Sequence, residues 1–129
     1  MLLPKKVKHR KWHVMRRNPD RVGVATRGTE VSFGSFGLKA TTACRVKSNQ
    51  IEAARKVISR AMGKSGKIWI RIFPDMPYTQ KPAEVKLGKG KGDLAGYVAQ
   101  VLPGRVMFEV DGVSETVAKL LKMSFRQVF

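Results

Sequence analysis

The sequence predicts an α+β fold. Short alternations of apolar and polar residues, typical of strands, lie on both sides of one clear amphipathic helix. These segments do not follow the regular strand–helix–strand order of a parallel sheet. The chain has 129 residues, of which 43% are hydrophobic, so it can build one domain with a modest core. We therefore expect a single domain over residues 1–129.

The first 30 residues form a basic arm without a helical apolar period. Two interpretations are open. The arm is either a solvated tail, or a segment that orders on RNA with its arginines on phosphates and Trp12 stacking on a base. We expect residues 1–21 of the arm to be mobile in the free protein. The candidate phosphate-binding residues of the arm are Lys5, Lys6, Lys8, Arg10, Lys11, Arg16, Arg17, Arg21 and Arg27.

Residues 31–40, VSFGSFGLKA, predict a strand with a bend. Gly34 and Gly37 indicate a bulge or a close approach of backbone. We expect Phe33 and Phe36 to lie in the core rather than to stack on bases.

Residues 49–62 predict a helix. Asn49 and Glu52 have the spacing of a capping box, and Gly63 suits the end of the helix. An apolar stripe at steps of three and four consists of Ile51, Ala54, Ile58, Ala61 and Met62. Arg55, Lys56 and Arg60 lie off the stripe, either as a solvated face or as phosphate contacts. We favour phosphate contacts for Arg55 and Arg60.

Residues 67–73, KIWIRIF, alternate as in a strand whose isoleucines face the core and whose Arg71 lies on the other face. We count Arg71 among the candidate RNA contacts. The PDMP segment ends this strand, since proline cannot continue a ladder. Residues 81–92 then combine lysine with glycine, which favours tight turns over regular structure. This composition predicts a flexible cationic loop that reaches for an anion.

The last third completes the domain. Residues 97–101 and 105–110 flank Leu102-Pro103-Gly104 and resemble a hairpin. Residues 114–123 predict a short second helix with Ser114 at its N-cap, and residues 125–129 a final strand.

The charge of the chain favours a polyanionic partner. There are 26 Lys and Arg against 9 Asp and Glu, a net charge of +17. A folded domain tolerates such self-repulsion best when a polyanion neutralises it. Nucleic acid is the expected partner, and an anionic membrane surface is the competitor. Because residues 93–129 carry four charges of each sign, the polyanion should face the first two thirds of the chain.

No residue pattern indicates an enzyme, a cofactor or a metal site. Gly88 is followed five residues later by Asp93, so the spacing of a phosphate-binding Walker loop fails. Cys44 is the only cysteine, which excludes an internal disulfide, and we expect a small buried thiol. His9 and His13 have helical spacing but sit among cations that would repel a metal. No apolar run is long enough to span a membrane.

Several segments together resemble a known family. VSFGSFGLKA (31–40), QIEAARKVISRAM (50–62), GKIWIRIFPDMP (66–77), KPAEVKLGKGKG (81–92) and VMFEVDGV (106–113) are similar, in this order, to the large-subunit ribosomal protein L16 (uL16) family of bacteria and organelles. The opening MLLPKKVKHRK is similar as well.

The resemblance implies an α/β-hammerhead-like mixed sheet with two helices, a basic arm and a Gly/Lys loop. It also implies a place on the large ribosomal subunit, in the cytoplasm or in an organelle, with large-subunit rRNA, tRNA and neighbouring ribosomal proteins as partners. No homo-oligomer is expected. The loop that the family points at tRNA near the peptidyl transferase centre corresponds to Lys81, Lys86, Gly88, Lys89, Gly90, Lys91 and Gly92.

Two departures from the family pattern affect these expectations. Lys86 stands where the family often has arginine, so a planar guanidinium is lost there. The C-terminal helix is also short, so contacts that the family makes through it should be reduced. The alternative function is a free-standing basic module that binds nucleic acid, such as a translation factor or a DNA-compacting protein. A membrane-active protein is disfavoured, because the predicted helix is patterned for a core.

Overall fold

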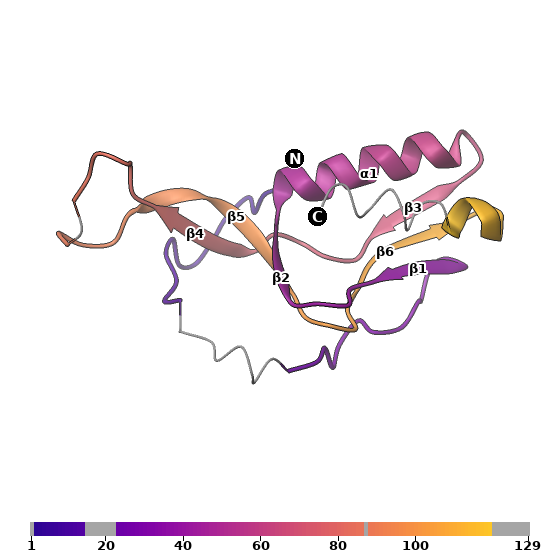
Figure 1. Ribbon diagram of the computed structural model, residues 1–129, viewed down its shortest axis with the longest axis horizontal. Coiled ribbons are helices and arrows are strands. Elements are labelled where there is room, and N and C mark those ends of the chain that lie inside the picture. The colour runs from indigo at the N-terminus through magenta and orange to yellow at the C-terminus, as the bar shows by residue number, and fades with distance from the viewer. Residues whose placement is uncertain (1, 15–22, 87, 120–129) are drawn as a thin grey trace.

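A computed structural model describes residues 2–14, 23–86 and 88–119. Two three-stranded sheets, one long helix and a short helical segment at residues 115–119 make up this part of the chain (Figure 1). One sheet has the order β1 (Phe36–Lys39), β6 (Val106–Asp111), β3 (Lys67–Ile70). The other has the order β2 (Cys44–Lys47), β5 (Asp93–Val101), β4 (Met76–Gln80). The α+β class is confirmed, but two sheets replace the single mixed sheet, and every strand pairing is antiparallel in the described residues.

The predicted hairpin of residues 97–101 and 105–110 is wrong. β5 pairs with β2 and β4, whereas β6 pairs with β1 and β3. Gly104, at φ +89°, turns the chain from one sheet into the other. Its N–H donates to the carbonyl of Ala40, and the N–H of Ala40 donates to the carbonyl of Arg105, both at 2.8 Å. The β5–β6 turn is therefore hydrogen-bonded to the β1–β2 connection, and these two connections cross from one sheet to the other side by side.

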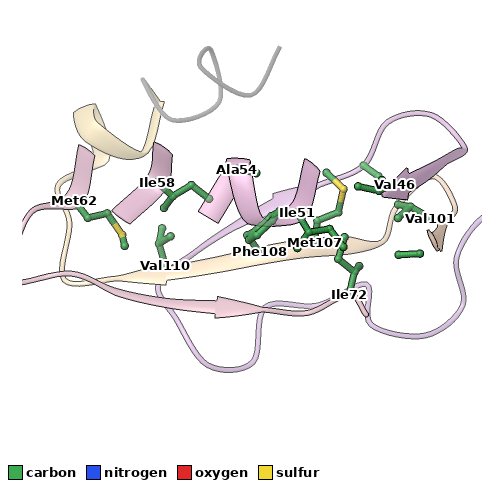
Figure 2. Close-up of a cluster of buried hydrophobic side chains, with 12 residues drawn as sticks. Val46, Ile51, Ala54, Ile58, Met62, Ile72, Val101, Met107, Phe108 and Val110 are labelled. Atoms are coloured by element: carbon green, nitrogen blue, oxygen red, sulfur yellow. The ribbon is translucent and has the colours of Figure 1, made fainter. Parts of the chain in front are cut away.

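Helix α1 (Ser48–Met62) covers one face of the β1-β6-β3 sheet (Figure 2). Ile51, Ala54, Ile58 and Met62 are buried, and Figure 2 shows them directed towards Phe108 and Val110 of β6. The predicted stripe is thus confirmed except at Ala61, which is exposed at the edge of the stripe in the last turn. The helix ends at Gly63, whose φ of +69° suits glycine.

The start of α1 differs from the prediction. The N-cap is Lys47, the last residue of β2, because the strand runs directly into the helix. The Gln50 side chain accepts a hydrogen bond from the Lys47 backbone N–H at 2.9 Å. The predicted capping box of Asn49 and Glu52 is therefore wrong, and Glu52 instead pairs with Arg55.

Two side chains predicted to be buried are exposed. Phe33 precedes β1, which is shorter than the predicted strand of residues 31–40, and its side chain is 60% exposed. Cys44 is the first residue of the edge strand β2, and its side chain is also exposed. Phe36, in contrast, packs against the core as expected.

Residues 115–119, the last described residues, are helical and belong to the predicted second helix. Its predicted continuation and the predicted strand of residues 125–129 lie outside the described residues. Within residues 2–14, 23–86 and 88–119, no helix is both long and apolar enough to span a membrane.

Candidate nucleic-acid interface

The Gly/Lys loop is the tip of the hairpin formed by β4 and β5. The pairing of Gln80 with Asp93 closes its base. Figure 1 shows the tip extending away from α1 and the β1-β6-β3 sheet. Lys86, Lys89 and Lys91 are exposed at this tip, so their charges are accessible to a partner.

The glycines of the loop serve two different purposes. Gly88 and Gly90 have φ values of +97° and +92°, and a Cβ on either would meet nothing within 4 Å. Glycine is favoured there by the backbone conformation and not by crowding within the protein. Lys89 between them also has a positive φ of 54°. At Gly92 a Cβ would lie 2.7 Å from the Gln80 carbonyl oxygen, so glycine permits close strand contact there.

Two lysines of the loop are held by the protein itself. The Lys81 ammonium donates to the carbonyl of Gly88 and so braces the loop internally. The Lys91 ammonium donates to the carbonyl of Trp12 in the N-terminal arm. Lys86 and Lys89 make no such contact within the described chain, which leaves them the better candidates for an external phosphate.

The N-terminal arm lies beside this hairpin. Besides the Lys91–Trp12 contact, the Lys11 ammonium lies 3.4 Å from a carboxylate oxygen of Asp93. At the start of the arm, Leu2 packs against the core. The fold thus joins the arm to the base of the loop, although about 80 residues separate them in sequence. The exposed cations between these anchors are Lys5, Lys6, Lys8 and Arg10.

The remaining candidate phosphate-binding residues of the first 30 are four arginines, and the structure describes one of them. Arg27 is exposed, and its carbonyl accepts a hydrogen bond from the Arg105 guanidinium at 2.8 Å. Arg16, Arg17 and Arg21 lie outside the described residues, so their role stays a prediction.

The outward face of α1 carries a second group of cations. Arg55 binds both carboxylate oxygens of Glu52, at 2.7 and 3.1 Å. The hydrogen bonds from Arg55 lower the pKa of Glu52, so the pair stays ionised and Arg55 is largely neutralised. Arg60 and Lys56 are exposed, and no ion pair involves either of them in the described part of the chain. Arg60 is therefore a more available phosphate ligand than Arg55.

Arg71 belongs to a third, internal cluster. β3 ends at Ile70 and is shorter than the predicted strand of residues 67–73, so Arg71 directly follows it. Its side chain lies on the face opposite the isoleucines, as predicted, but its guanidinium pairs with the buried carboxylate of Glu109. The other oxygen of Glu109 accepts N–H bonds from Ser32, Phe33 and Gly34, at 3.1, 2.6 and 3.1 Å. Burial raises the pKa of Glu109, but these donors and Arg71 outweigh it, so the pKa falls below its usual value.

Sequence reasoning missed Glu109. The available signal was a lone carboxylate inside the apolar run VMFEV. A charge at such a position either is buried with hydrogen-bonding partners or requires that its face of the strand be turned to solvent. Among the described residues, no group of His, Cys, Asp and Glu is arranged to hold a metal ion.

The structure therefore brings together the arm and the Gly/Lys loop, and places the α1 cations and Arg71 elsewhere. None of these groups forms an enclosed pocket with paired acid and base. The arrangement suits an extended polyanion that contacts several exposed cations at once.

Comparisons with known proteins agree with the resemblance found in the sequence. Residues 4–126 match the family described as ribosomal protein L16p/L10e. Over 119 residues the chain is 56% identical to the large ribosomal subunit protein uL16 of Francisella philomiragia, covering 92% of this chain and 84% of that protein. It is 54% identical, with the same coverage, to the uL16 protein of Francisella tularensis subsp. novicida.

Proposed function

The chain belongs to the ribosomal protein L16p/L10e family, and we propose that it binds rRNA and presents its Gly/Lys loop to tRNA. As a member of this family it is a structural component of the large ribosomal subunit and not an enzyme. We place it in cytoplasmic ribosomes, where neighbouring large-subunit proteins would complete its surroundings.

The rRNA part of the proposal rests on the exposed cations. Lys5, Lys6, Lys8 and Arg10 of the arm, together with Arg60 of α1, are accessible and carry no partner charge in the described chain. Lys11, Arg55 and Arg71 already pair with carboxylates of the protein, so we expect them to contribute less per residue. Arg27 engages the protein through its backbone carbonyl, so its exposed side chain counts with the accessible cations. Phosphate contacts of this kind fix a protein on RNA without reading its sequence.

The tRNA part rests on the shape of the β4–β5 hairpin. A projecting loop whose exposed lysines alternate with glycines can enter a narrow cleft and reach phosphates there. The family resemblance directs this loop towards tRNA near the peptidyl transferase centre. The arm contacts at Lys91 and Asp93 hold the base of the hairpin, so rRNA bound by the arm would also position the loop. This projecting hairpin is the single observation that carries the proposed role in tRNA accommodation.

The test separates the free lysines of the loop from the lysine that binds the arm. The double change Lys86→Ala and Lys89→Ala removes two exposed charges, and surface substitutions usually alter stability by no more than about 0.5 kcal/mol each. We expect normal assembly into large subunits, scored by gradient sedimentation, and slower accommodation of aminoacyl-tRNA on the purified ribosomes.

Lys91→Ala is the matched control, because it removes one loop charge and also the contact with Trp12. We expect it to weaken incorporation of the free protein into subunits more than the double change does. Normal accommodation by the double variant would contradict the tRNA role. Failed assembly of that variant would make the loop an rRNA anchor instead. A wild-type chain that sediments apart from large subunits after a high-salt wash would favour the free-standing nucleic-acid-binding module.

A further inference from the structure

The face of the β1-β6-β3 sheet opposite α1 displays an exposed aromatic side chain. Phe33 is 60% exposed, yet it is not isolated. Its ring stacks on Trp69 with centroids 6.2 Å apart and planes inclined by 20°. The guanidinium carbon of Arg71 lies 4.8 Å from the centre of the same ring. We call these three side chains the Phe33 platform.

The backbone beneath Phe33 is held firmly. Glu109 lies in β6 between Gly37 of β1 and Trp69 of β3, and its side chain is fully buried. A buried carboxylate is costly unless its hydrogen-bonding capacity is satisfied. Here the N–H groups of residues 32–34 and the Arg71 guanidinium supply the donors. The carboxylate therefore fixes the segment that carries Phe33.

Close packing limits this segment further. A Cβ on Gly34 would lie 2.6 Å from the carbonyl oxygen of Val110 and 3.2 Å from the Trp69 ring. The segment therefore lies directly on β6 and cannot move closer. An aromatic ring that is already ordered loses little conformational freedom when a partner stacks on it.

The charges around the platform favour an anionic partner. The ammonium of Lys67 lies 5.9 Å from the centre of the Trp69 ring, and Arg71 adjoins Phe33. Of the nearby carboxylates, Glu109 is enclosed and Asp111 accepts a hydrogen bond from the Ser35 hydroxyl. Glu30 is exposed three residues before Phe33 and is the one opposing charge in the segment of residues 30–35.

We propose that the Phe33 platform receives an unpaired base of the RNA, which stacks on the exposed part of the Phe33 ring while Lys67 and Arg71 approach the adjoining phosphates. Stacking on aromatic side chains is how proteins hold unpaired RNA bases, and it tolerates any base. This inference rests on the proposed RNA-binding function and adds to it a stacking contact that is separate from the charged arm and loop.

Affinity for deproteinised large-subunit rRNA, measured with the full chain over a range of salt concentrations, tests the proposal. We expect Phe33→Ala to weaken binding about 5- to 150-fold, the equivalent of about 1–3 kcal/mol for one stacked base. Phe33→Tyr should retain wild-type affinity because it keeps the aromatic face. Phe33→Leu, which keeps apolar area but no aromatic face, should behave like Phe33→Ala.

The slope of log K against log salt should be unchanged in all three variants, because no phosphate contact is lost. Phe73→Ala is the matched control: Phe73 is also exposed, and in the described chain it has neither a stacked ring nor a cation over it. We expect it to bind as the wild type does.

A photoreactive benzoylphenylalanine in place of Phe33, in assembled large subunits, identifies the partner directly. We expect a crosslink to rRNA. A crosslink to a ribosomal protein, or rescue by Phe33→Leu, would overturn the inference in favour of a protein contact. Wild-type affinity of Phe33→Ala would overturn it as well, while steep salt dependence would leave the proposed RNA binding intact. Absence of rRNA binding by the wild-type chain would contradict the proposed function itself.

Discussion

Among single residues, Glu109 and Gly34 position the segment that carries Phe33, a role that their places in the sequence do not indicate. Glu109 accepts hydrogen bonds from three backbone N–H groups that are 75 to 77 residues away in the sequence. It also binds the guanidinium of Arg71, which is 38 residues away. Gly34 allows the segment to lie against the Val110 carbonyl. A side chain at one position and the lack of one at the other thus determine where Phe33 lies.

Replacement of Glu109 by glutamine should destabilise the protein. The change leaves Arg71 without its partner and turns one accepting oxygen into a donor that faces other donors. Loss of one partner of a buried ion pair costs about 3–5 kcal/mol, and we expect about 3 kcal/mol because Arg71 retains some access to water. Urea denaturation of both proteins at neutral pH measures this difference in the free energy of unfolding.

The same pair of proteins gives the pH dependence. The pKa of Glu109 is lowered in the folded state, so its contribution is present above the ordinary glutamate pKa of about 4.3 and is lost as pH falls through the folded-state value. The gap between wild type and Glu109→Gln should therefore be constant near neutral pH and shrink in acid. Glu52 and Asp111, whose pKa values are also lowered, are common to both proteins and cancel. A gap of the same size at about pH 7 and about pH 3 would contradict this account.

At the scale of elements, α1 illustrates how one helix serves a core and a surface at once. Its buried face is continuous, whereas its outward face contains one arginine that is neutralised by Glu52 and one that pairs with no carboxylate among the described residues. The sequence spacing puts Arg55 and Arg60 on the same outward side of the helix. They differ in their availability to a phosphate, because Arg55 forms an ion pair with Glu52. Arg60 also sits in the last turn, where a cation interacts favourably with the helix dipole.

Opposite effects on rRNA binding are expected from two changes on this face. Arg60→Ala should weaken binding and flatten the slope of log K against log salt by about 0.7, the value for one phosphate contact with single strands. Glu52→Gln should release Arg55, strengthen binding and steepen the slope by about the same amount. Salt-dependent binding of rRNA to the free chain measures both.

Glu115→Gln is the control for the second change. Glu115 also pairs with a cation, Lys119, at 2.7 Å, but it lies in the part of the chain with no net charge. Its loss should leave the slope unaltered. If Glu52→Gln also left the slope unaltered, Arg55 would not reach a phosphate.

For the molecule as a whole, the residues that carry the net charge are also those that the fold exposes to a polyanionic partner. The net charge of +17 resides in the first two thirds of the sequence, and the fold uses those residues for the arm, α1 and the projecting hairpin. The electrically balanced last third supplies β5 and β6, the central strands of the two sheets. The chain thus separates a neutral scaffold from cationic surfaces.

Binding to rRNA should consequently depend steeply on salt. If about five to eight phosphates are neutralised, the slope of log K against log salt should be near −4 to −6, at roughly −0.7 per contact. The measurement uses the free wild-type chain and large-subunit rRNA. A slope shallower than about −2 would show that phosphate contacts do not dominate the affinity.

The features that depend on neighbours along the chain could be predicted from the order of the amino acids. The period of the apolar residues predicted the position of α1 and its buried side. The glycines predicted the loop at residues 88–90 and the helix end at Gly63, and Gly63, Gly88 and Gly90 do adopt positive φ. The family followed from several motifs in order, which the comparisons confirm.

The contacts between distant segments, in contrast, became visible in the fold alone. Local alternation shows that residues 97–101 and 105–110 are strands, but it does not show which strands they pair with, and they separate into two sheets. The buried role of Glu109, the exposure of Phe33 and the contact of Lys91 with Trp12 were equally hidden. The physical reason is that periodicity records which side of a segment is apolar, whereas strand partners and buried ion pairs are selected by how the whole chain packs.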